Sequence, residues 1–125
     1  MLSVSPLSKA EVAHLYHTGL SLLASGNIAD AVEKLISAAR AGHADAAFQL
    51  AKYCSKHGQV ENAFHWAIMA ANGRHAEAQN MVATMYMDGQ GVPVSRADAM
   101  NWHRSASALG NAESEKFLAA RRSSH

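Results

Sequence analysis

The chain has 125 residues, of which 49% are hydrophobic and 17% charged, a composition typical of one globular domain and not of a disordered segment. Eleven Lys and Arg side chains against ten Asp and Glu give a net charge of +1, which argues against a nucleic-acid or membrane-surface partner. The single cysteine excludes an internal disulfide, no apolar run reaches the roughly 18 residues of a membrane span, and the N-terminus lacks a signal-peptide pattern. We therefore expect a cytoplasmic protein.

The sequence predicts helices throughout. It is rich in alanine, contains only two prolines and has few runs of β-branched residues. Glycines divide it into segments of the length of short helices. In chain order we expect helices near residues 9–24, 28–41, 44–57, 60–72, 76–88, 97–109 and 111–122.

Small residues recur at regular spacing, which indicates an internal repeat. Three series show it: Gly19, Ala51 and Ala83; Ala31, Ala63 and Ala99; and Ala38, Ala70 and Ala106. The spacing is thirty-two residues throughout, except that the second step of the last two series is thirty-six. Each repeat is predicted to be a helical hairpin whose small residues let two helices approach closely. The four extra residues fall in a turn at 88–93, where an insertion disturbs neither helix.

Residues 78–112 carry a longer pattern. Its members are Ala78-Gln79, Val82-Ala83, Tyr86, Gly89-x-Gly91-Val92-Pro93, Ala99-x-x-Trp102, Ala106 and Gly110-Asn111-Ala112. This pattern resembles a nearly complete Sel-one-like repeat, a branch of the tetratricopeptide-like superfamily. The resemblance implies an all-α, right-handed α-solenoid of antiparallel helix hairpins. It also implies a single domain over 1–125, with repeats at about 12–43, 44–75 and 76–111 and a capping helix at about 111–122.

Most of the conspicuous residues are predicted to shape the repeat. Trp66 and Trp102 occupy equivalent positions and are expected to fill the space between helices. Cys54 is expected to be a small core residue. Gly89 and Gly91 are expected to supply positive φ angles in the turn of the third hairpin.

Histidine is frequent, with eight in the chain. His14 and His17 are three residues apart, a spacing at which two side chains on one helical face can share a metal, but no third ligand lies nearby in the sequence. His43 and His75 occupy equivalent positions and are expected at helix boundaries. No catalytic motif stands out, so we expect no enzymatic activity and no cofactor; a metal site at the histidine pair or a reactive Cys54 is the alternative.

The resemblance implies that function lies on the concave groove lined by the first helix of each hairpin. Family geometry turns eight candidate partner-binding side chains toward this groove: Tyr16, Leu20, Leu23, Phe48, Lys52, Asn80, Thr84 and Met87. The N-terminal part of this set is apolar and aromatic, which is typical of a surface that anchors an apolar side chain of a partner. Residues 1–10, folded back over the first repeat, are an alternative cover for Leu20 and Leu23.

We therefore predict a non-enzymatic protein–protein interaction module, that is, an adaptor, a scaffold or a chaperone-like protein that binds a segment of another protein. A self-associating homodimer is the alternative, with a second copy on the groove or on an open end of the solenoid. Neither a nucleic acid nor a membrane is an expected partner.

Overall fold

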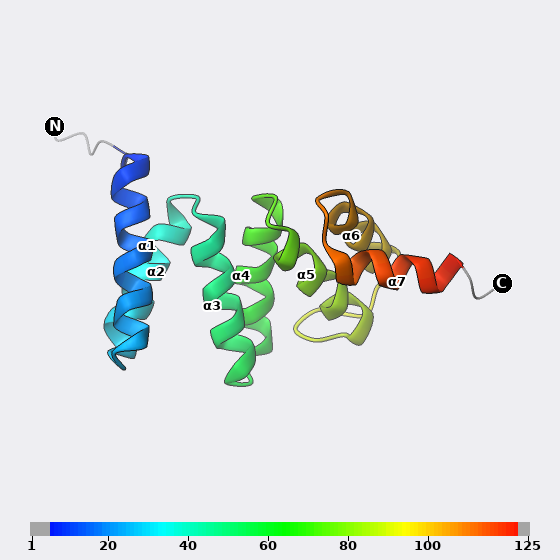
Figure 1. Cartoon of the computed structure of the whole chain (residues 1–125). Coiled ribbons are helices and arrows are strands. Elements are labelled where there is room, and N and C mark those ends of the chain that lie inside the picture. Colours follow the sequence, from blue (N-terminus) through cyan, green and yellow to red (C-terminus); the bar gives the residue numbers. More distant parts are fainter. Residues whose placement is uncertain (1–5, 123–125) are drawn as a thin grey trace, which may run out of the picture.

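The structure, a computed structural model, describes residues 6–122, which form seven α-helices (Figure 1). The helices are α1 (Lys9–Ala24), α2 (Ile28–Arg40), α3 (Ala44–Lys56), α4 (Val60–Asn72), α5 (Ala76–Asp88), α6 (Arg96–Ala108) and α7 (Ala112–Arg122). The predicted all-α fold is confirmed, and each predicted helix agrees with an observed helix to within one residue at either end. Within the described range, no helix is both long enough and apolar enough to cross a membrane.

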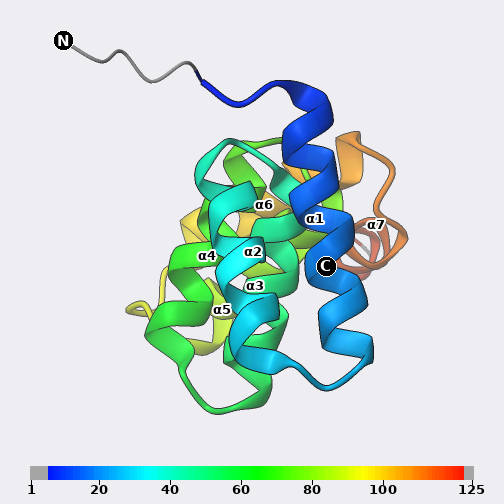
Figure 2. The same ribbon diagram turned by 90° about the vertical axis from the view of Figure 1, so that its left-hand side faces the viewer.

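Consecutive helices pack into hairpins that follow one another along a line. The extensive contacts between helices all join neighbours in the chain, from α1 with α2 through to α6 with α7. Figure 1 shows the resulting elongated arrangement, with α1 at one end and α7 near the other. In the perpendicular view of Figure 2 the hairpins lie one behind another. Because each hairpin packs mainly on the hairpins before and after it, the chain forms a solenoid.

The close approach of the helices depends on the recurring small residues. Six alanines of the second helices have no exposed surface: Ala31, Ala38, Ala63, Ala70, Ala99 and Ala106. Ala51 and Ala83, on the first helices, are equally buried. A methyl group on Gly19 would lie 2.9 Å from Cδ2 of Leu35, so even an alanine would crowd that contact. The sequence repeat is therefore a repeat of helix packing.

Histidines cap two of the first helices. Nδ1 of His43 accepts a hydrogen bond from the backbone N–H of Ala46 at 3.1 Å, and His75 caps the N–H of Ala78 at the same distance. An accepting Nδ1 places the proton of a neutral ring on Nε2. In His75 this Nε2 lies 2.9 Å from Oδ1 of Asp45, so the cap also joins the start of α5 to α3. The expectation that both histidines lie at helix boundaries is confirmed.

The turn between α5 and α6 contains the four-residue insertion. Gly89 and Gly91 both have a φ angle of +71°, in the left-handed region that favours glycine, as predicted. A Cβ atom on Gly91 would overlap the carbonyl oxygen of Val60 at the start of α4. The turn therefore packs directly against the preceding hairpin, and only glycine permits that contact.

The larger side chains fill the spaces that the alanines leave. Trp66 and Trp102 pack against the hydrophobic core, although both are only partly buried. Cys54 is 7% exposed and belongs to the core. The rings of Phe64 and Tyr86 meet edge to face with centroids 5.3 Å apart, which joins α4 to α5. The predicted packing role of Trp66, Trp102 and Cys54 is confirmed.

Replacing Gly91 by alanine is expected to reduce the free energy of unfolding by about 2–4 kcal/mol, because the substitution adds both backbone strain and an overlap with Val60. Gly58 is the matched control, since its φ angle is +75° and no atom lies within 4 Å of a Cβ built there. Gly58→Ala should cost only about 1 kcal/mol. Urea unfolding of the two variants measures the difference, and equal losses would show that the turn does not press on α4.

Replacing Trp102 by alanine is expected to cost about 2–4 kcal/mol, somewhat less than the loss of a fully buried ring, because part of the indole is exposed. Thermal unfolding followed by circular dichroism measures this loss. A loss below about 1 kcal/mol would mean that the ring does not support the packing of the third hairpin.

Candidate partner-binding groove

A cavity of about 610 Å³ lies where α3, α5 and the start of α7 meet. It brings together four of the predicted residues, namely Phe48 and Lys52 from α3 and Asn80 and Thr84 from α5. The rest of its lining consists of Ser55, Glu77, Met81, Met85, Gln90, Asn111, Ala112 and Glu113. The first helices of two successive hairpins and the terminal helix thus share one hollow.

A second cavity, of about 300 Å³, adjoins the first. The two cavities share Asn80, Thr84 and Glu113. Met87, a fifth predicted residue, lines the second cavity, and the remaining members are Asp88, His103 and Phe117. We refer to the two cavities together as the C-terminal groove.

The other three predicted residues lie elsewhere. Tyr16, Leu20 and Leu23 line neither cavity and are partly buried on α1. The ring of Tyr16 stacks on His43 with centroids 4.3 Å apart, and burial raises the pKa of its hydroxyl. Phe48, which was expected to extend the same apolar surface, is only 8% exposed. Much of this surface is therefore covered by the chain's own side chains.

Residues 6–10 do not cover Leu20 or Leu23. The last two of them form the first turn of α1, and the first three are exposed and lead into the end of that helix remote from Leu23 (Figure 2). The alternative in which the N-terminus folds back is wrong for these residues, because α1 itself carries them away from Leu23. The rest of the predicted cover, residues 1–5, lies outside the described residues.

A series of hydrogen bonds joins α5, α6 and α7 beside the C-terminal groove. The hydroxyl of Ser114, which is fully buried, donates to Oδ1 of Asn80 at 2.9 Å, and Nδ2 of Asn80 donates to Glu113 at 3.2 Å. A hydroxyl has one proton, so the 3.0 Å contact between Oγ of Ser114 and Nδ1 of His103 requires the ring nitrogen to donate. The network fixes α7 on α5 and holds the Glu113 carboxylate at both cavities.

The surroundings of the His103 ring favour its neutral form. The ring is 3% exposed and stacks on Phe117 with ring centroids 4.0 Å apart. Burial lowers the pKa of His103, and the positive charge of Arg121 lowers it further. With the proton on Nδ1, the neutral ring keeps a lone pair on Nε2. The wall of the second cavity therefore includes a histidine that can accept a hydrogen bond.

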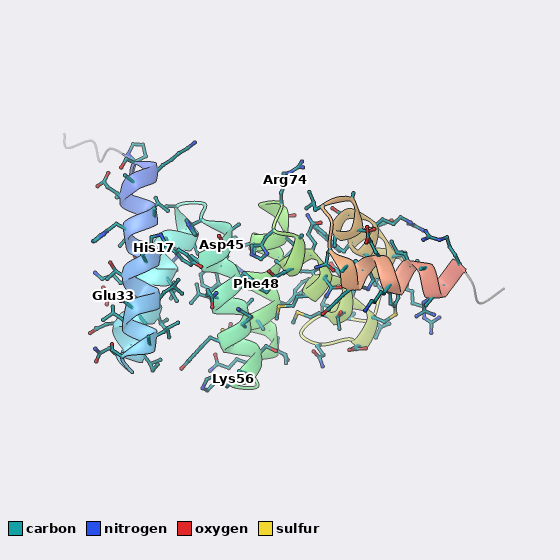
Figure 3. The ribbon with its side chains drawn as sticks, viewed as in Figure 1. His17, Glu33, Asp45, Phe48, Lys56 and Arg74 are labelled. Atoms are coloured by element: carbon teal, nitrogen blue, oxygen red, sulfur yellow. The ribbon has the colours of Figure 1, made fainter. Side chains whose placement is uncertain are left out.

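The aromatic ring in the larger cavity already contacts a cation. Nζ of Lys52 lies 4.8 Å from the centroid of Phe48, within the range of a cation–π interaction. Figure 3 shows Phe48 on α3 with Asp45 about one turn before it and Lys56 at the far end of the helix. Lys52 thus covers part of the ring, and a bound segment would meet both groups together.

The sequence did not indicate His103 or Phe117 as groove residues. His103 lies on a second helix, which the repeat geometry places away from the groove, and it reaches the second cavity only through its packing against α7. Glu113 is equivalent in the repeat to Asp45 and Glu77, both on first helices, and family geometry turns it toward the groove, although it is not among the eight candidate residues. No comparable signal marks Phe117.

The alternative metal and thiol sites lack the geometry that their chemistry needs. His14 and His17 are exposed on α1, and no three His, Cys, Asp or Glu side chains within residues 6–122 form a group that could hold a metal. Burial raises the pKa of the Cys54 thiol, which favours its unreactive protonated form. Ser114, despite its histidine partner, is fully buried, so it is not placed to attack a substrate.

Three consecutive stretches of the chain, residues 6–43, 44–75 and 76–111, match the Sel1 repeat. The chain belongs to the Sel1 repeat family. The resemblance that the sequence suggested is confirmed. Sel1 repeats generally mediate protein interactions and are typically non-catalytic.

Two solved structures share the Sel1 repeat fold of this chain. A Sel1 repeat protein from Oxalobacter formigenes is 26% identical, with a TM-score of 0.80 over 88% of this chain and 89% of that one. A protective antigen of uropathogenic Escherichia coli strains that displays an SLR fold is 23% identical, with a TM-score of 0.75; the match covers 85% of this chain but 24% of the antigen. No protein of curated function matches the sequence.

The lowered pKa of His103 is expected to make the stability of this Sel1 repeat chain depend on pH. The unfolded chain, in which the histidine pKa is about 6.5, takes up the proton more readily than the folded chain. The stability present above about pH 6.5 is therefore lost as the pH falls from that value toward the lower folded pKa. His103→Gln keeps an N–H donor for Ser114 but cannot titrate. Urea unfolding at about pH 7.5 and pH 5.5 should show a larger loss for the wild type than for this variant; equal losses would contradict the assignment.

Proposed function

We propose that this Sel1 repeat chain is a non-enzymatic interaction module that binds a segment of another protein in the C-terminal groove. The observation that carries the proposal is the 610 Å³ cavity that α3, α5 and α7 line together. Its volume falls in the range of ligand-binding clefts, roughly 300–1,000 Å³. Five of the eight residues that family geometry turns toward a concave groove line this groove.

The lining suits an extended peptide segment. Phe48 and Met81 offer apolar contact, whereas Lys52 and Glu113 offer charges of both signs. Such a mixture can satisfy the main chain and the side chains of one segment together. Because the Ser114 network fixes α7 in advance, little ordering is left to be done on binding. An adaptor or scaffold role requires only such a preformed binding surface.

A tyrosine at Thr84 is expected to fill the groove and to weaken binding of the partner by about tenfold or more. Ser37 supplies a matched control on α2, because both hydroxyls are exposed and each donates to the carbonyl oxygen four residues earlier at 3.1 Å. Ser37 lines neither cavity, so Ser37→Tyr should leave the affinity within about twofold. The partner is captured with the wild-type chain, and its affinity for each variant is measured by calorimetry.

If both variants weaken binding equally, or if neither variant weakens it, the result contradicts binding in the groove. The same experiment separates the homodimer alternative. If the captured partner is a second copy of the chain, and Thr84→Tyr converts the dimer to a monomer in light scattering, then self-association replaces the adaptor role.

A further inference from the structure

The second cavity of the C-terminal groove differs in charge from the first. Its ionised side chains are Asp88 and Glu113, and its wall contains no Lys or Arg among the described residues. The first cavity, in contrast, has the ammonium group of Lys52 in its wall. The second cavity is therefore a negatively charged pocket beside the proposed path of the partner segment.

Apart from Asn80, whose Nδ2 donates to Glu113, the other polar groups of this pocket are hydrogen-bond acceptors. Oγ1 of Thr84 donates its proton to the backbone oxygen of Asn80 at 3.1 Å, so it offers a ligand only its lone pairs. The His103 ring, 3% exposed, uses Nδ1 on Ser114, and its Nε2 has no hydrogen-bond partner among the described residues. Two carboxylates, one hydroxyl oxygen and one ring nitrogen can thus accept from a ligand.

Contacts within the chain hold Glu113 and His103 in place. Asn80 donates to Glu113 at 3.2 Å, and the Phe117 ring stacks on His103 at 4.0 Å. Arg121 lies on Phe117, with Cζ 4.7 Å from the ring centroid, and is not part of the cavity wall. Acceptors that are positioned before a ligand arrives lose less freedom when it binds.

A ligand for such a pocket must bring positive charge and several donors. The guanidinium group of arginine has five N–H donors in a planar fork and no acceptor, and it stays charged at neutral pH. Its aliphatic stem can lie on Met87, and a pocket of about 300 Å³ is large enough for the whole side chain. Building on the function proposed above, we propose that the second cavity takes an arginine side chain of the bound partner segment, with the guanidinium facing Asp88, Glu113 and Nε2 of His103.

The proposal is tested on the full chain by NMR titration with N-acetyl-arginine methylamide. We expect saturable shifts of the backbone amides of Asn80, Thr84 and Glu113. The citrulline analogue, which has nearly the same shape but no charge, should give no saturable shift, and the lysine analogue should bind more weakly because it lacks the planar fork. Free L-arginine has the same net charge as the blocked amide, but it brings a hydrated ammonium and a hydrated carboxylate that a residue within a segment lacks. It should therefore bind no more tightly than the blocked amide.

Two substitutions on the same helix turn provide a matched pair. Glu113→Gln can still accept from Asn80 but loses the charge, so the affinity for the arginine probe should fall by about five- to tenfold. Glu115 is also exposed in the first turn of α7 but lines neither cavity, so Glu115→Gln should change the affinity by less than about twofold.

Equal binding of the citrulline and arginine probes, equal losses in the two variants, or no saturation with the arginine probe would each overturn the proposal. Tighter binding of free arginine than of the blocked amide would mean that the pocket takes free arginine and not an arginine side chain of a partner segment. A partner that Thr84→Tyr releases but that binds Glu113→Gln as tightly as the wild type would leave the proposed function standing and remove the arginine pocket.

Discussion

The architecture depends on helix backbones that approach closely at positions where only a hydrogen atom or a methyl group fits. Ala31, Ala63 and Ala99 occupy one such position in successive hairpins, and none has exposed surface. Interiors are packed densely enough that a larger side chain at such a site would force the helices apart. Because the same small residues recur in each repeat, the hairpins share one geometry, and the first helices come to line a common face.

The groove depends on this regularity and on one element outside the repeated hairpins, the terminal helix α7. The regular stacking of α3 and α5 aligns Phe48 and Lys52 with Asn80 and Thr84. The terminal helix then supplies the remaining wall, and it is fixed by the buried hydroxyl of Ser114. A buried hydroxyl is costly unless its hydrogen bonds are made, so this network specifies one position of α7 and not several.

The sequence predicted the fold to within one residue at each helix end, because the spacing of the small residues and glycines records the helix packing directly. It also placed His43 and His75 at helix boundaries and required glycine at residue 91. The groove was predictable only in part. The contacts of His103 and Ser114 depend on how α7 packs on α5 and α6, which neither spacing nor composition encodes. Tyr16 was expected in the groove, but its ring packs against His43 instead, a contact between side chains from two hairpins.

The central claim, that the partner lies in the C-terminal groove, is tested most directly by photo-crosslinking from two positions on one helix. Lys52 lines the larger cavity, whereas Lys56, about one turn further along α3, lines neither cavity (Figure 3). Benzoylphenylalanine replaces each lysine in turn, and mass spectrometry identifies what becomes attached. We expect a covalent adduct with the partner from residue 52 and none from residue 56. An adduct from residue 56 alone would place the partner outside the groove and contradict the account.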